Sequence, residues 1–111
     1  MNEIELNKVK EIAEKLDWNI DINDNEFTFS KHSPAGQDFS FSEYAEYLEE
    51  LIDNISAYCK GFDCSEETFL WLDNFGHGKN GAPYDMKDLY EDMEACLKMV
   101  NDLKDELKTL I

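Results

Sequence analysis

The feature that most constrains the fold is an apolar repeat in the last part of the chain. Its members follow one another at alternating spacings of three and four residues: Met86, Leu89, Met93, Cys96, Val100, Leu103, Leu107 and Leu110. This spacing predicts one long helix that buries a continuous face. Tyr90, Leu97 and Ile111 widen that face on one flank, beyond the stripe of a bare coiled coil. We therefore expect the helix to pack on its own chain, with a homodimer through the same seam as the alternative.

The first part of the chain changes its apolar period from that of a helix to that of a strand. Residues 2–17 place apolar side chains near one face, which predicts a first helix. Apolar and polar residues then alternate in three short runs, which predicts three strands. The apolar members of these runs are Trp18, Ile20, Ile22, Phe27, Phe29, Phe39 and Phe41. Asp24-Asn25 fits a hairpin turn and Ser33–Gly36 fits a loop, so we expect an antiparallel meander with one aromatic face.

The helical period returns in the middle of the chain. Ser42 has the character of an N-cap, and the helix that it would begin ends at Gly61. The predicted buried stripe of this helix is Tyr44, Tyr47, Leu48, Leu51, Ile52, Ile55 and Tyr58. Asp63 and Glu66 have the spacing of a capping box, which predicts a short helix. The expected inward residues of that helix are Phe69, Leu70 and Leu72.

Together these elements predict a single α+β domain over residues 1–111. Its expected order is an N-terminal helix, a three-stranded antiparallel meander, and then three helices of which the last is long.

Charge excludes several classes of function. The 111 residues include 26 acids and 10 bases, a net charge of −16, and residues 38–94 hold 15 acids and only 3 lysines. Every base is lysine, so the chain lacks the arginine-bearing face that grips phosphates in a nucleic-acid-binding protein. An acidic surface instead attracts a basic partner, such as a protein that itself binds nucleic acid. Solubility alone is the other explanation of so high a charge.

The sequence also predicts where the protein resides. No apolar run reaches the roughly 20 residues that a membrane span needs. The first residues, MNEIELNKVK, do not have the apolar core of a signal peptide. We therefore expect a cytoplasmic protein whose three cysteines are reduced.

A glycine-rich stretch, Asn74–Met86, raises the question of a phosphate, metal or catalytic loop. Its lysine precedes the last glycine and no serine or threonine follows, unlike a phosphate-binding loop. Neither histidine, His32 nor His77, lies in a known catalytic or zinc-ligand pattern, so we expect no enzyme, metal or cofactor. The stretch fits a connector between helices, and its polar residues His77, Lys79 and Asn80 are candidate partner contacts.

Two groups of acids have the spacing of neighbours on a helix face, about 5–6 Å apart between Cβ atoms. The first group is Glu46, Glu49, Glu50 and Asp53, and the second is Asp85, Asp88, Glu91 and Asp92. Phosphates of a nucleic-acid strand repeat at a comparable separation, so two such rows on neighbouring helices would imitate a duplex backbone. Dense like charges repel one another, which suggests that they are kept for a basic partner. The predicted acidic contact set is Glu46, Glu49, Glu50, Asp53, Asp88, Glu91 and Asp92.

Two segments carry a resemblance to a group of known proteins. Ser33–Phe41 and Gly76–Met86, the latter followed by Leu89–Cys96, resemble small acidic proteins of phages and other mobile elements of low-GC gut bacteria. The resemblance spans residues 27–96 and assigns no catalytic residues. It implies a setting in which small acidic proteins include anti-restriction and anti-CRISPR inhibitors of host defence nucleases.

The sequence therefore predicts a non-catalytic inhibitor of a nucleic-acid-targeting defence nuclease, similar to anti-CRISPR proteins. It would occupy a basic nucleic-acid cleft of a CRISPR effector or a related protein by acidic mimicry. The alternative is an interaction module that dimerises or docks through its C-terminal helix.

Overall fold

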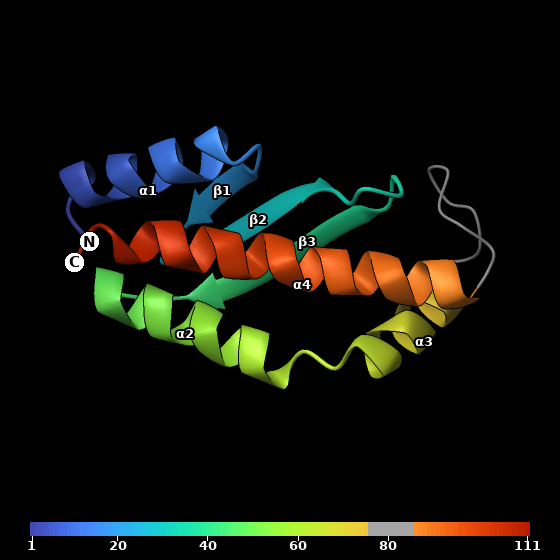
Figure 1. Cartoon of the computed structure of the whole chain (residues 1–111). Coiled ribbons are helices and arrows are strands. Elements are labelled where there is room, and N and C mark those ends of the chain that lie inside the picture. The colour runs from blue at the N-terminus through green and yellow to red at the C-terminus, as the bar shows by residue number, and fades with distance from the viewer. Residues whose placement is uncertain (76–85) are drawn as a thin grey trace.

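The computed structural model describes the backbone of residues 1–75 and 86–111 and the side chains of residues 1–70 and 86–111. Its elements follow in this order: α1 (Glu3–Lys15), β1 (Asn19–Asn23), β2 (Glu26–His32), β3 (Asp38–Tyr44), α2 (Leu48–Gly61), α3 (Cys64–Phe75) and α4 (Met86–Lys108). This is the predicted α+β architecture. Helix α4 runs the length of the molecule across the sheet, with α1 and α2 on either side of its C-terminal part (Figure 1).

The sheet is the predicted antiparallel meander, with strand order β1-β2-β3. Phe29 is the partner of Ile20 on one side and of Phe41 on the other, so the apolar side chains of the three strands share one face. Asp24 and Asn25 form the first hairpin turn with φ values of 48° and 65°. Both lie in the left-handed region that a two-residue type I′ hairpin requires and that Asn and Asp tolerate.

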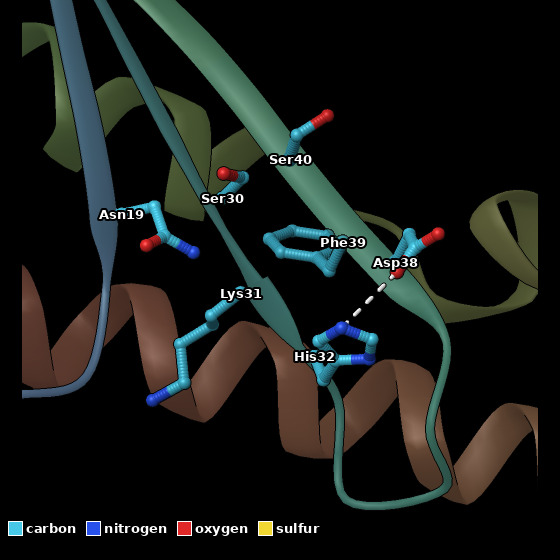
Figure 2. Close-up of a pocket in the computed structure, with 7 residues that line it drawn as sticks. All are labelled: Asn19, Ser30, Lys31, His32, Asp38, Phe39 and Ser40. Carbon is cyan, nitrogen blue, oxygen red and sulfur yellow. Dashed lines mark ion pairs between the residues drawn. The ribbon is translucent and has the colours of Figure 1, made fainter. Parts of the chain in front are cut away.

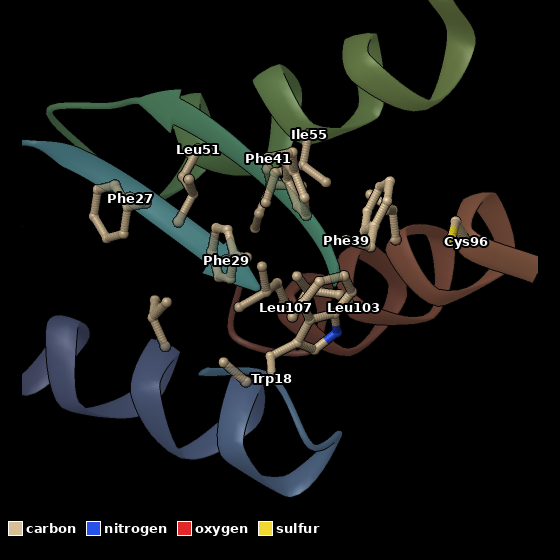
Figure 3. Close-up of a cluster of buried hydrophobic side chains, with 14 of the residues drawn as sticks. Trp18, Phe27, Phe29, Phe39, Phe41, Leu51, Ile55, Cys96, Leu103 and Leu107 are labelled. Carbon is tan, nitrogen blue, oxygen red and sulfur yellow. The ribbon is translucent and has the colours of Figure 1, made fainter. Parts of the chain in front are cut away.

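The hydrophobic core lies between the aromatic face of the sheet and the three helices α1, α2 and α4. Trp18 packs edge-on against Phe29 and Phe41, and the rings of these two phenylalanines stack at 5.1 Å between centroids (Figure 3). The seam of α4 is almost fully buried against this cluster from Leu89 to Leu107. The prediction of packing within the chain is thus confirmed for most of the seam, whereas its first residue, Met86, is exposed and its last, Leu110, is half-buried.

The predicted start of α2 at Ser42 is wrong. Ser42 is still in β3, where it pairs with Thr28 and the two hydroxyl oxygens lie 2.9 Å apart. Sheet pairing continues to Tyr44, and α2 begins only at Leu48. Ladder hydrogen bonds with β2 therefore outweigh the local preference of serine for an N-cap. As a consequence, Tyr44 and Tyr47 are not part of the buried stripe: their exposed fractions are 64% and 54%.

The predicted inward face of α3 is also wrong. Asp63 does cap this helix, because its Oδ1 accepts from the backbone N–H groups of Ser65 and Glu66 at 2.9 and 3.2 Å. However, α3 buries Thr68, while Phe69 and Leu70 are exposed. The hydroxyl of Thr68 donates to a backbone carbonyl within the helix at 2.6 Å, which satisfies its polar group in that buried position. The side chain of Leu72 lies outside the described residues.

Candidate functional site

The first predicted acidic group lies where β3 leads into α2. Glu46 precedes the helix, Glu49 and Glu50 are in its first turn, and Asp53 is one turn further on. Glu46, Glu49 and Asp53 are exposed, on the side away from the buried stripe of α2. Glu50 differs, since its Oε1 accepts from the backbone N–H of Glu46 at 2.8 Å, which joins the residue before the N-cap to the first turn of the helix. Three of the four carboxylates are therefore free to face a partner.

Three members of the second acidic group, Asp88, Glu91 and Asp92, lie in the first two turns of α4 and differ in burial, whereas Asp85 lies outside the described residues. Asp88 and Glu91 are exposed and line a shallow depression beside the loop between β2 and β3. Asp92 is 4% exposed and is bound within the chain, so it presents no carboxylate to a partner. This corrects the prediction that all three acids form a contact row.

The structure places the two acidic groups at opposite ends of the molecule. Helix α2 begins at the end of the molecule where both termini lie, whereas α4 begins at the opposite end, next to α3 (Figure 1). The molecule is 44 Å long and 23 Å across, so the groups are separated along its long axis. Neighbouring helices therefore do not carry the two parallel rows that the sequence predicted. The acids instead extend along an elongated body.

Lysines form no ion pair with the exposed acids of α2 in the part of the chain that the structure describes. The ion pairs found there join Lys15 to Glu106, His32 to Asp38, Lys98 to Asp102 and Lys104 to Asp105. None of these pairs involves Glu46, Glu49, Asp53, Asp88 or Glu91. These pairs leave the exposed acids of α2 without a lysine partner, although the N-terminal ammonium lies close by and donates to the Glu46 backbone carbonyl at 2.7 Å. At the start of α4, Lys87 shares the first two turns with Asp88 and Glu91.

Asp92 ties the loop between β2 and β3 to α4. Its Oδ2 accepts from the Ser33 hydroxyl at 2.6 Å and from the Gln37 side-chain amide at 2.7 Å, and its Oδ1 accepts from the Ala35 backbone N–H at 3.0 Å. The Ser33 hydroxyl oxygen also accepts from the backbone N–H of Gln37 at 2.9 Å. Such a set of donors offsets the cost of burying a carboxylate. We call these residues, Ser33, Ala35, Gln37 and Asp92, the loop latch.

The loop latch is the site feature that the sequence reasoning missed. One signal was present, because Asp92 follows Leu89 by three residues and precedes Cys96 by four, which places it beside two buried members of the seam. An acid in such a position needs polar partners inside the fold. The sequence did not identify those partners, since they come from a loop more than fifty residues away.

A second depression, of about 300 Å³, lies where β2 and β3 reach the loop. Figure 2 shows its lining residues, which are Asn19, Ser30, Lys31, His32, Asp38, Phe39 and Ser40. His32 Nε2 and Asp38 Oδ1 lie 3.5 Å apart, and both side chains are largely exposed, so solvent screens this pair. Among the described residues, no hydrogen bond joins the hydroxyl of Ser30 or Ser40 to His32.

The three cysteines lack the surroundings of a reactive thiol. All are free thiols, with Cys96 buried and Cys59 and Cys64 half-buried. Burial raises the pKa of each thiol, and for Cys64 and Cys96 nearby acids raise it further. Lys104 opposes the shift of the Cys59 pKa, but burial has the larger effect. Because the thiolate is the nucleophilic form, these pKa shifts disfavour cysteine chemistry near neutral pH.

The remaining predicted contacts, His77, Lys79 and Asn80, lie outside the described residues. Within residues 1–70 and 86–111, no cluster of His, Cys, Asp and Glu side chains has the geometry of a metal site. No helix in the described part of the chain combines the length and apolar character that crossing a bilayer requires. Comparisons of the chain with protein-family models, with curated proteins and with solved structures find no match.

Proposed function

We propose that this protein is a non-catalytic inhibitor that occupies the basic nucleic-acid cleft of a nucleic-acid-handling protein, such as a CRISPR effector or another defence nuclease. The observation that carries the proposal is a high net negative charge along an elongated body. Dividing the 44 Å length by the net charge of −16 gives one net negative charge per about 2.8 Å. A DNA duplex carries one per about 1.7 Å of its axis. The protein therefore offers a basic cleft a charge density of the same order as its natural ligand.

The exposed acids of α2 are the best candidates for the main contact. Glu49 and Asp53 are four residues apart on one side of the helix, and Glu46 extends them toward β3. Asp88 and Glu91 would meet a different part of the partner, at the far end of the body. We therefore propose that the protein resembles a duplex in its charge per unit length. Its acids do not need to reproduce the two rows of phosphates.

The alternative module that docks or dimerises through its C-terminal helix has less support. Most of the seam that would form such an interface is covered by the sheet and by α1 and α2. A partner that used it would have to displace the core.

Capture from a bacterial lysate, followed by competition, tests the proposal. The immobilised protein should retain basic nucleic-acid-binding proteins at low salt and retain less of them at moderate salt. Added duplex DNA or guide RNA should then release the captured protein, because both ligands would occupy one cleft. A captured protein that binds nucleic acid and this chain at the same time would contradict the proposal.

A further inference from the structure

A groove between α3 and α4 gathers exposed apolar side chains at one end of the molecule. Its volume is about 280 Å³, and it is lined by Ser65, Thr68, Phe69, Met86, Lys87 and Tyr90. The exposed fraction of Phe69 is 57%, and those of Met86 and Tyr90 are 39% and 38%. Leu70, next to Phe69, is exposed as well. Large apolar side chains that gather around a hollow are typical of an interaction site, whereas single exposed ones are not.

Acids flank this α3–α4 groove. Glu66 precedes Phe69 by three residues on α3, and Glu94 follows Tyr90 by four on α4, so each lies beside an apolar lining residue. Both acids are exposed. Lys87 also lines the groove, whereas Asp88 and Glu91 line the separate depression beside the loop between β2 and β3. The groove is therefore lined by apolar side chains together with Lys87, and it is flanked by Glu66 and Glu94, which we call its acidic rim.

We infer that the α3–α4 groove binds an amphipathic helical segment of the partner, with an apolar side chain in the groove and lysines or arginines on the acidic rim. An apolar groove with acidic edges is complementary to a basic amphipathic helix. A second copy of this chain is a poor occupant, because it carries the same acidic rim and a net charge of −16. The inference rests on the proposed function, since it assigns the apolar part of the same contact.

The groove would slow the dissociation of the partner, which exposed acids alone do not. Exposed charge pairs chiefly raise the association rate and lose strength in salt. Burial of one apolar anchor slows dissociation and persists in salt, as for other anchors at the centre of an interface. The acidic body would thus guide the partner, and the groove would retain it.

Two synthetic helices test the inference without knowledge of the partner. The first has leucines on one face and lysines elsewhere, and the second has the same leucine face with glutamates in place of the lysines. Each is titrated into the full-length protein, and NMR signals of the Met86 methyl group and the Phe69 and Tyr90 rings are followed. We expect the lysine helix to shift these signals and the glutamate helix to leave them unchanged.

The variant Phe69→Ser should weaken binding of the lysine helix by about tenfold or more, since an anchor is lost. Phe69 is exposed, so circular dichroism should show an unchanged fold. The matched control is Tyr47→Ser, which removes an equally exposed aromatic ring outside the groove and should leave the affinity unchanged.

Three results would overturn the inference. They are equal affinity of Phe69→Ser and the native protein, equal binding of both helices, and a native dimer in sedimentation that Phe69→Ser converts to a monomer. If Phe69→Ser instead has no effect while reversal of the α2 acids abolishes capture of the partner, the proposed function stands and only the groove is excluded.

Discussion

At the scale of single residues, Asp92 best separates the roles that acids play in this chain. Its neighbour Glu91 is exposed to solvent, whereas Asp92 accepts three hydrogen bonds from the loop between β2 and β3. The two residues are adjacent on α4 and identical in charge. Burial and intramolecular hydrogen bonds, rather than charge, therefore distinguish the structural role of Asp92 from the availability of Glu91 for binding.

We expect Asp92→Asn to lower the free energy of unfolding by about 2–4 kcal/mol. An amide offers one acceptor oxygen, so either the Ala35 N–H or the pair of donors from Ser33 and Gln37 would face an N–H group instead. Urea denaturation followed by circular dichroism measures the change. Glu91→Gln is the matched control and should stay within about 0.5 kcal/mol of the native value. Equal stability of the two variants would show that the loop latch does not stabilise the fold.

The thiols provide a residue-scale test of the non-catalytic assignment. Burial raises the pKa of Cys59, Cys64 and Cys96, and a raised pKa leaves little thiolate at pH 8. We expect iodoacetamide to alkylate Cys59 and Cys64 more slowly than free cysteine, and Cys96 only after denaturation, as read by mass spectrometry. A cysteine that reacts faster than free cysteine would indicate an activated nucleophile and would contradict the proposal of a non-catalytic protein.

At the scale of elements, α4 organises the core. Its residues Val100, Leu103 and Leu107 are fully buried among side chains of the sheet and of the flanking helices (Figure 3). Leu103→Ala should therefore destabilise the protein by about 2–5 kcal/mol, through lost burial and the cavity that remains. Ile111→Ala, at an exposed position of the same chain end, should change stability little. Thermal unfolding of both variants measures the difference, and similar melting temperatures would contradict the packing of the seam.

The elements also show what the sequence was able to predict. Strong periodicity predicted α1, the three strands and α4, because an apolar period of 2 or 3.6 directly reports which face is buried. The start of α2 was mispredicted, since Ser42 satisfies local capping rules while its strand partner Thr28 lies fourteen residues earlier. The buried face of α3 was mispredicted for a similar reason. The face that a short helix buries depends on the neighbouring element, which is here α4.

Local chemistry explains part of the acidity. Acids occupy the first turn of every helix: Glu3 and Glu5 in α1, Glu49 and Glu50 in α2, Glu66 and Glu67 in α3, and Asp88 in α4. Negative charge there is favourable because the N-terminal end of a helix is positive. Asp53 and Glu91 lie beyond the first turn of their helices, and this effect falls off within that turn. These two acids are therefore more informative about a partner than their neighbours.

At the scale of the whole molecule, the arrangement of charge was the least predictable property. The sequence identified both acidic groups and their spacing along each helix. It did not reveal that α2 and α4 start at opposite ends of the body (Figure 1). The direction in which two helices run past each other depends on their connection through α3 and on core packing, and no single helix encodes it. The predicted double row of carboxylates was accordingly replaced by acids spread along 44 Å.

We claim that a basic partner binds the exposed acids of α2, so paired charge reversals on that helix should weaken the binding. Glu49→Lys with Asp53→Lys changes the contact, and Glu11→Lys with Glu14→Lys makes the same change in net charge on the exposed side of α1. Affinity for the captured partner is measured by surface plasmon resonance at low and moderate salt. Urea denaturation confirms that both variants remain folded. We expect the α2 variant to lose about tenfold or more in affinity, mostly through a slower association rate, and the α1 variant to lose much less. Equal losses in both variants, or no loss in either, would contradict the claim.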